Sequence, residues 1–132
     1  RFAANVARLG VHHGFGLTVT LPRIVGNQRA LELLYTGRRI SGEEAHAIGL
    51  ADRLVAPGEL RSAAHDLAAD IAASAPLAVV SIRENMRGDL ADAVVAATDH
   101  EQVEQYRMRQ TNDWSEGVAA MADRRQPRFT GS

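Results

Sequence analysis

The residues best suited to chemistry stand together in one short segment, His12-His13-Gly14-Phe15-Gly16. An imidazole has an ordinary pKa of about 6.5, so either histidine can accept or release a proton near neutral pH. Gly14 and Gly16 are expected where the backbone turns or passes close to another group, as part of the pocket backbone. Two interpretations of His12 and His13 stay open. They are catalytic acid/base groups, or they cap the turn or stack at a subunit contact.

A second candidate site is the basic cluster near the end of the chain, Arg124, Arg125 and Arg128. A guanidinium group presents two parallel N–H donors that match the oxygens of a phosphate. Arg124 and Arg128 are therefore candidates for binding a phosphorylated ligand. The alternative is a solvated basic turn.

Composition excludes several classes of function. Cysteine and lysine are both absent, which removes thiolate and Schiff-base chemistry. The net charge of -1 argues against a nucleic-acid binder. No apolar run approaches the roughly 20 residues that span a bilayer, and the start does not resemble a signal peptide, so a cytoplasmic protein is expected. The remaining histidines lack metal-ligand spacing, so neither a metal site nor a cofactor is predicted.

Residues 1–56 have a mixed pattern. Gly26 and Gly37 interrupt it, and Asn27 is a candidate helix cap. The predicted elements are a strand leading into a turn over 2–11, helices over 17–25, 28–34 and 42–48, a short extended piece before Ile40, and a short strand over 50–55.

Ser41 and Glu44 have the spacing of a capping box. In that motif Ser41 accepts from the Glu44 amide while the Glu44 carboxylate reaches back. Glu43 and Glu44 also lie where the helix dipole stabilises negative charge. A structural role is therefore predicted for both glutamates.

Residues 57–132 have a mostly helical pattern that follows the break at Pro57-Gly58. Helices are predicted over 58–73, 77–87 and about 90–110, with a last helix that Asn112 or Asp113 caps and that runs to about 123. The candidates for the buried faces of the long helix are Val94, Val95, Thr98, Val103, Tyr106 and Met108.

The order of motifs resembles the crotonase superfamily, the enoyl-CoA hydratase/isomerase family. Its L-G-x-x-P-G-x-G-x-T pattern is matched from Leu9 to Thr18 except that His13 replaces the proline, and its T-G-R-x-I pattern is matched from Thr36 to Ile40. The C-terminal signature is matched at Asp113, Glu116, Gly117, Arg125, Pro127, Phe129 and Gly131. The resemblance covers essentially the whole chain.

The resemblance implies an α/β crotonase-like fold, of which this chain is the C-terminal half and predominantly helical. Residues 1–56 would end the ββα spiral core, and residues 57–132 would form a helical region that builds a homotrimer or hexamer. The upstream half of such proteins supplies the two N–H groups that hold the thioester oxyanion. A truncated chain is expected here.

The resemblance also implies an acyl-CoA substrate, with coenzyme A as part of that substrate, and chemistry through a thioester enolate. Val6 stands where hydratases carry a catalytic glutamate, and valine cannot accept a proton. Isomerase-like proton transfer is therefore expected in place of ordinary hydration, with His12 and His13 as substitutes. Arg124 takes the position of a CoA-binding lysine. The alternative is a non-catalytic oligomerisation module or inactive fragment, so activity of this chain alone stays open.

Overall fold

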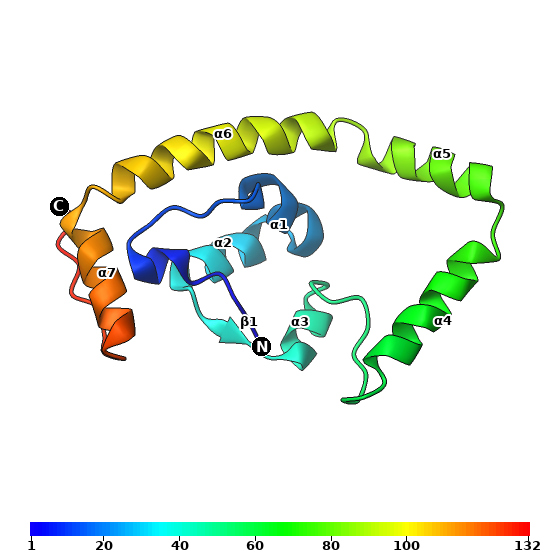
Figure 1. Ribbon diagram of the computed structural model, residues 1–132, viewed down its shortest axis with the longest axis horizontal. Coiled ribbons are helices and arrows are strands. Elements are labelled where there is room, and N and C mark those ends of the chain that lie inside the picture. Colours follow the sequence, from blue (N-terminus) through cyan, green and yellow to red (C-terminus); the bar gives the residue numbers. More distant parts are fainter.

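The computed structural model describes residues 1–132 and consists of a small body, a projecting arm and two further helices (Figure 1). The body contains β1 (Phe2–Ala3), the 3-10 helix η1 (Asn5–Leu9), α1 (Leu17–Val25), α2 (Asn27–Thr36), β2 (Arg39–Ile40) and α3 (Gly42–Ala47). The arm is α4 (Leu60–Ala72) and α5 (Pro76–Arg87), followed by α6 (Leu90–Met108) and α7 (Asn112–Ala122).

The core lies between α1, α2 and the two strands. β1 pairs antiparallel with β2, so that Phe2 faces Ile40. Apolar residues recur at helical spacing on α1 and α2 and meet in two small clusters. These clusters contain Leu21, Val25, Ala30 and Leu34, and then Leu33, Ile40 and Ala45.

Glycines set the ends of the body helices. Gly26 ends α1 and is the N-cap of α2, so Asn27 is the first helical residue and not the cap that its side chain predicted. Gly37 ends α2 in the left-handed conformation at φ 54°. Pro22 lies inside α1, which runs through it as one helix.

Of two predicted strands, the one over 50–55 is wrong and the one over 2–11 is shorter than predicted. Residues 50–52 form bends and residues 53–55 form no regular element, because the amides of Leu50 and Ala51 both donate to the Ala45 carbonyl at the end of α3. The predicted strand over 2–11 is confined to Phe2–Ala3. The amides of Gly10 and Val11 bond locally to Ala7 and Val6, which favours the turn of η1 over a ladder.

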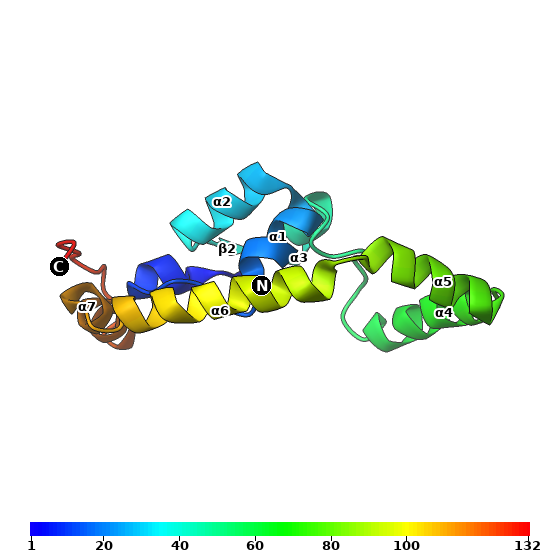
Figure 2. The same ribbon diagram turned by 90° about the horizontal axis from the view of Figure 1, so that it is seen from above.

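The second half is helical, as predicted, and α6 runs alongside the body while the arm projects beyond it (Figures 1 and 2). Neither α4 nor α5 has a buried residue. On α6 the expected core residues Val95, Val103 and Tyr106 are 61%, 60% and 59% exposed. The buried residue of α6 is Glu101.

The accessible surface is large for the size of the chain. It is 9661 Å² for 14.2 kDa, whereas a folded monomer of that mass exposes about 6,800 Å². The excess of about 2,900 Å² is of the size that an obligate interface covers. Much of it is apolar, because Leu60, Leu77 and Met86 of the arm are 72%, 84% and 76% exposed.

No single helix combines the length and apolarity needed to cross a membrane. The pair Leu60–Ala72 and Pro76–Met108 passes by length and composition only, with a bend of 105°.

Candidate functional site

His12 and His13 stack on each other in the loop between η1 and α1. Their ring centroids are 4.1 Å apart and their planes differ by 28°. The His12 Nδ1 lies 2.8 Å from the carbonyl oxygen of His13. The loop then turns through Phe15 and Gly16, both with positive φ, at 63° and 70°.

One hollow of about 660 Å³ contains both histidines and Val6. We call it the Val6 hollow; its further lining comes from the end of η1, α2, the end of α6 and the C-terminal tail. The carboxylate in its wall, Asp113, accepts hydrogen bonds from the amides of Thr130 and Gly131, at 2.7 and 3.0 Å. That carboxylate is committed to the tail, which leaves the two imidazoles and the Tyr35 hydroxyl as the groups of this hollow that can transfer a proton.

Glu101 is a buried carboxylate that the sequence analysis missed. Its side chain is 1% exposed and binds the start of α1. Oε2 accepts from the Gly16 amide at 2.8 Å, and Oε1 accepts from the Thr18 amide at 2.9 Å and the Thr18 hydroxyl at 2.7 Å. Burial alone would raise the pKa of Glu101, but the hydrogen bonds from Thr18 and Gly16 outweigh it and hold the pKa below its ordinary value.

His13 is tied to the same group. Its Nε2 lies 2.8 Å from the Thr18 hydroxyl oxygen and 3.6 Å from Glu101 Oε1. Burial and the neighbouring His12 lower the pKa of His13, and Glu101 opposes them with a smaller effect. A lowered pKa keeps the imidazole neutral at neutral pH, which is the form that accepts a proton.

Gly14 and Gly16 let this loop lie directly against α6. A Cβ on Gly14 would stand 2.5 Å from Gln105 Nε2, and one on Gly16 would stand 2.9 Å from the Val94 side chain. Both glycines are buried, and neither lines the Val6 hollow. Their role in the site is therefore to let the backbone of this loop approach α6 closely.

Arg124 lines a second hollow, of about 510 Å³, which we call the arginine hollow. Arg8, Arg38, Arg39 and Arg125 also lie in its wall. Arg38 and Arg125 are neutralised by glutamates, whereas Arg8, Arg39 and Arg124 make no ion pair. The structure places Arg128 in a different hollow, beside Glu116 and Asp113, so the two predicted phosphate ligands are not brought together.

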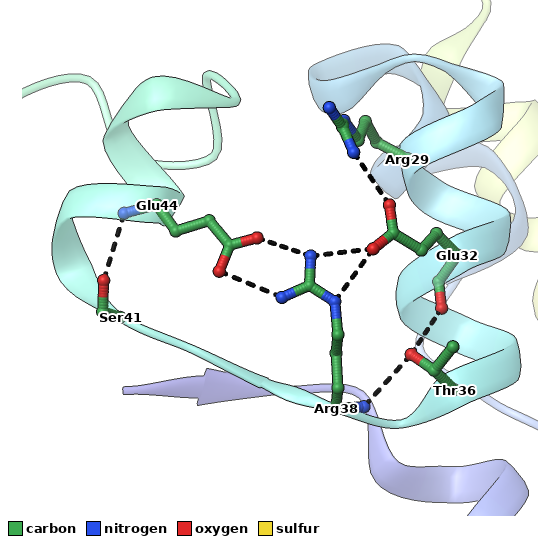
Figure 3. A network of polar contacts seen from close by, with 6 residues as sticks. All are labelled: Arg29, Glu32, Thr36, Arg38, Ser41 and Glu44. Atoms are coloured by element: carbon green, nitrogen blue, oxygen red, sulfur yellow. Dashed lines mark hydrogen bonds and ion pairs between the residues drawn. The ribbon is translucent and has the colours of Figure 1, made fainter.

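Arg38 is the centre of a polar network that joins α2 to α3 (Figure 3). Its guanidinium donates to Glu32 at 2.9 Å and to Glu44 at 3.0 Å. Ser41 accepts from the Glu44 amide at 3.2 Å, as the capping box predicts. The Glu44 carboxylate, however, does not reach back, because the bidentate contact with Arg38 is the stronger partner.

An apolar groove of about 550 Å³ is lined by the first six residues of the chain together with residues of α1 and α2. Ten of its twelve lining residues are hydrophobic, among them Phe2, Leu17, Leu21 and Leu33. Val6 lines this groove as well as the Val6 hollow. Phe15 stands at the groove with 93% of its surface exposed.

The motif order and this arrangement have a match among known proteins. The family model described as enoyl-CoA hydratase/isomerase matches residues 1–132, the whole chain. The chain belongs to the enoyl-CoA hydratase/isomerase family. The crotonase resemblance of the sequence is thereby confirmed.

Relatives agree with this assignment. The chain is 35% identical to YngF of Bacillus subtilis (strain 168) over 145 residues, covering 99% of this chain and 53% of YngF. It is 38% identical over 130 residues to the human mitochondrial enoyl-CoA hydratase domain-containing protein 2, covering 92% and 43%. The chain spans about half the length of the curated relatives it matches.

Solved structures of the family confirm the fold. An enoyl-CoA hydratase/isomerase from Pseudoalteromonas atlantica T6c has a TM-score of 0.83 at 26% identity, covering 95% of this chain and 50% of that one. A carnitinyl-CoA dehydratase from Mycobacterium avium 104 has a TM-score of 0.84 at 26% identity, covering 98% and 52%. The crotonase-like fold therefore extends over the body, the arm and both further helices.

Proposed function

We propose that this chain is the acyl-CoA-binding and proton-transferring part of an enoyl-CoA hydratase/isomerase family protein. The observation that carries the proposal is the meeting of Val6, His12 and His13 in one hollow. Val6 takes the position of the usual hydratase glutamate, so the candidate general bases are the imidazoles of His12 and His13. The reaction class that suits one such base is migration of a double bond through a thioester enolate.

The enolate needs stabilisation that this chain does not supply. Its negative charge rests on the thioester oxygen, and two aimed N–H donors are the family's means of holding it. The relatives are about twice as long as this chain. We assign the two N–H donors to a segment that corresponds to the half of the relatives that this chain does not match. The chain alone then binds acyl-CoA without turning it over.

The arginine hollow is the proposed site for a CoA phosphate. Three guanidinium groups there, of Arg8, Arg39 and Arg124, carry unpaired charge around one concave surface. The hollow of Arg128 also contains the carboxylates of Glu116 and Asp113, which repel an anion. Of the two predicted ligands, Arg124 is therefore the better supported.

A second candidate function, assembly without catalysis, is favoured by the excess surface of about 2,900 Å². In this candidate the apolar arm packs against further copies in a homotrimer or hexamer. Sedimentation analysis at micromolar concentration tests it. A trimer supports assembly, and a monomer with no acyl-CoA affinity contradicts both candidates. A cytoplasmic location is proposed with either.

Calorimetric titration tests the acyl-CoA proposal. Crotonyl-CoA and free CoA should bind saturably, and dephospho-CoA, which lacks the 3′-phosphate, should bind more weakly. Arg124→Ala should lower the affinity for CoA about tenfold, the value of one lost charge-assisted contact of about 1.4 kcal/mol. Arg61→Ala, on the exposed arm, is the matched control. Equal affinity of the two variants, or no heat with any ligand, would contradict the proposal.

A further inference from the structure

We propose that Glu101 and Thr18 are positioning residues that fix His13 as the proton acceptor of the Val6 hollow, through its Nδ1. This inference rests on the proposed function. It concerns two residues that lie 83 positions apart and that share a hydrogen bond of 2.7 Å.

The direction of each hydrogen bond follows from what each atom can donate. Ionised Glu101 can only accept, so the single hydroxyl proton of Thr18 points at Oε1. The Thr18 oxygen then has only lone pairs to offer His13, at 2.8 Å. His13 must therefore carry its proton on Nε2, and the lone pair of the neutral ring is on Nδ1.

The reverse arrangement leaves an oxygen pair without a proton. If Thr18 donated to His13, its oxygen and Glu101 Oε1 would face each other at 2.7 Å with no hydrogen between them. Because Glu101 is 1% exposed, solvent does not reach its carboxylate to screen that repulsion. The hydrogen-bonded series Glu101–Thr18–His13 consequently has one stable direction of donation. We call this series the relay.

His12 has the opposite tautomer. Its Nδ1 faces the His13 carbonyl oxygen at 2.8 Å, and a carbonyl can only accept. His12 therefore carries its proton on Nδ1, which is the less common form of the free side chain. The two stacked rings thus present different nitrogens as bases.

The relay keeps its geometry when His13 takes up a proton. In the step, a C–H bond of the acyl chain breaks, its electron pair enters the thioester enolate, and an N–H bond forms at His13 Nδ1. The Nε2–H and Thr18 bonds remain as they were. Glu101 Oε1, 3.6 Å from Nε2, stabilises the imidazolium. Return of the proton to another carbon moves the double bond and restores the neutral ring.

Nuclear magnetic resonance of the 132-residue chain, with ¹⁵N-labelled histidine and no ligand, tests the relay. His13 should show an exchange-protected ring proton on Nε2, and neutral His12 should be in its Nδ1–H form. Thr18→Val should remove the protected His13 proton, whereas Thr18→Ser should keep it. Thr20→Val is the matched control, since the Thr20 hydroxyl bonds only the Gly16 carbonyl, at 3.0 Å.

Two results would overturn the relay. One is a protected His13 proton on Nδ1. The other is a Thr18→Val spectrum with the Nε2 proton intact. If Thr18→Val does not fold, loss of the protected proton in Glu101→Ala with retention in Thr18→Ser supports the relay, and retention in both contradicts it. Because no ligand is present, these results are independent of the binding experiment for the proposed function.

Discussion

Gly117 of α7 lies directly against the backbone of Leu9 in η1. A Cβ built on Gly117 would stand 2.5 Å from both the carbonyl carbon and the carbonyl oxygen of Leu9. From the opposite side, a Cβ on Gly10 would meet the Asp113 carbonyl oxygen at 2.5 Å. The last helix is thus fixed to the segment that carries Val6, and its Asp113 lies in the wall of the Val6 hollow.

Gly117→Ala should destabilise the protein. Alanine is the better helix former by about 1 kcal/mol, so helix propensity alone predicts a gain. The new methyl group, however, overlaps backbone that cannot rotate away, and overpacking of this kind costs about 1–3 kcal/mol. Thermal unfolding followed by circular dichroism checks the sign. Ser115→Ala, exposed on the same helix, should unfold as the unaltered chain does, and a stabilised Gly117→Ala would contradict the contact.

Glu101→Ala should lower the unfolding free energy by about 1–3 kcal/mol, because it leaves the buried amides of Gly16 and Thr18 without an acceptor. Urea unfolding measures this loss. Asp99→Ala, two residues away and exposed on α6, should change stability little. Equal effects of the two substitutions would show that the carboxylate does not hold the loop.

Glu116→Gln should reduce the loss of folding stability that occurs as the pH falls. Hydrogen bonds from the Arg125 side chain and the Arg128 amide lower the pKa of Glu116 to about 2. A lowered folded-state pKa contributes stability that is complete above the ordinary glutamate range and is lost as the pH falls towards about 2. The gap between the urea midpoints of the unaltered chain and the variant should therefore be widest at pH 7 and should narrow as the pH falls from the ordinary glutamate range towards about 2.

Glu84→Gln is the control for this pH dependence, since Glu84 makes no ion pair. Its midpoint should follow that of the unaltered chain at every pH. A gap for Glu116→Gln that persists at pH 2 would indicate that shape, and not charge, joins Glu116 to the C-terminal tail.

The parts of the fold that sequence predicted are those with strong local signals. Helices followed from apolar spacing, as in α4 and α6, and their ends followed from glycines such as Gly37. Leu50 was assigned wrongly to a strand because its amide bonds to the end of α3, which no local pattern shows. Val103 has helical spacing yet lies exposed, since spacing identifies an apolar face but not what covers it.

The candidate site was predictable only in part. His12, His13 and Arg124 were singled out by residue type and by family motifs. Glu101 was missed because an acidic residue in a helix is normally solvated. A signal existed: Glu101 follows the half-buried Val94 and Ala97 at intervals that return to one helix face. A carboxylate on the inner face of a helix needs donors from another element, and those come from Gly16 and Thr18, more than 80 positions away.

The most direct test of the account is a titration of crotonyl-CoA into the 132-residue chain, followed through the ring protons of its five histidines. Saturable shifts of His12 and His13 are expected, with smaller shifts of the same two rings with free CoA and none of His65 on the arm. Unmoved His12 and His13 at saturating crotonyl-CoA, or equal shifts of all five histidines, would contradict the placement of the acyl group in the Val6 hollow.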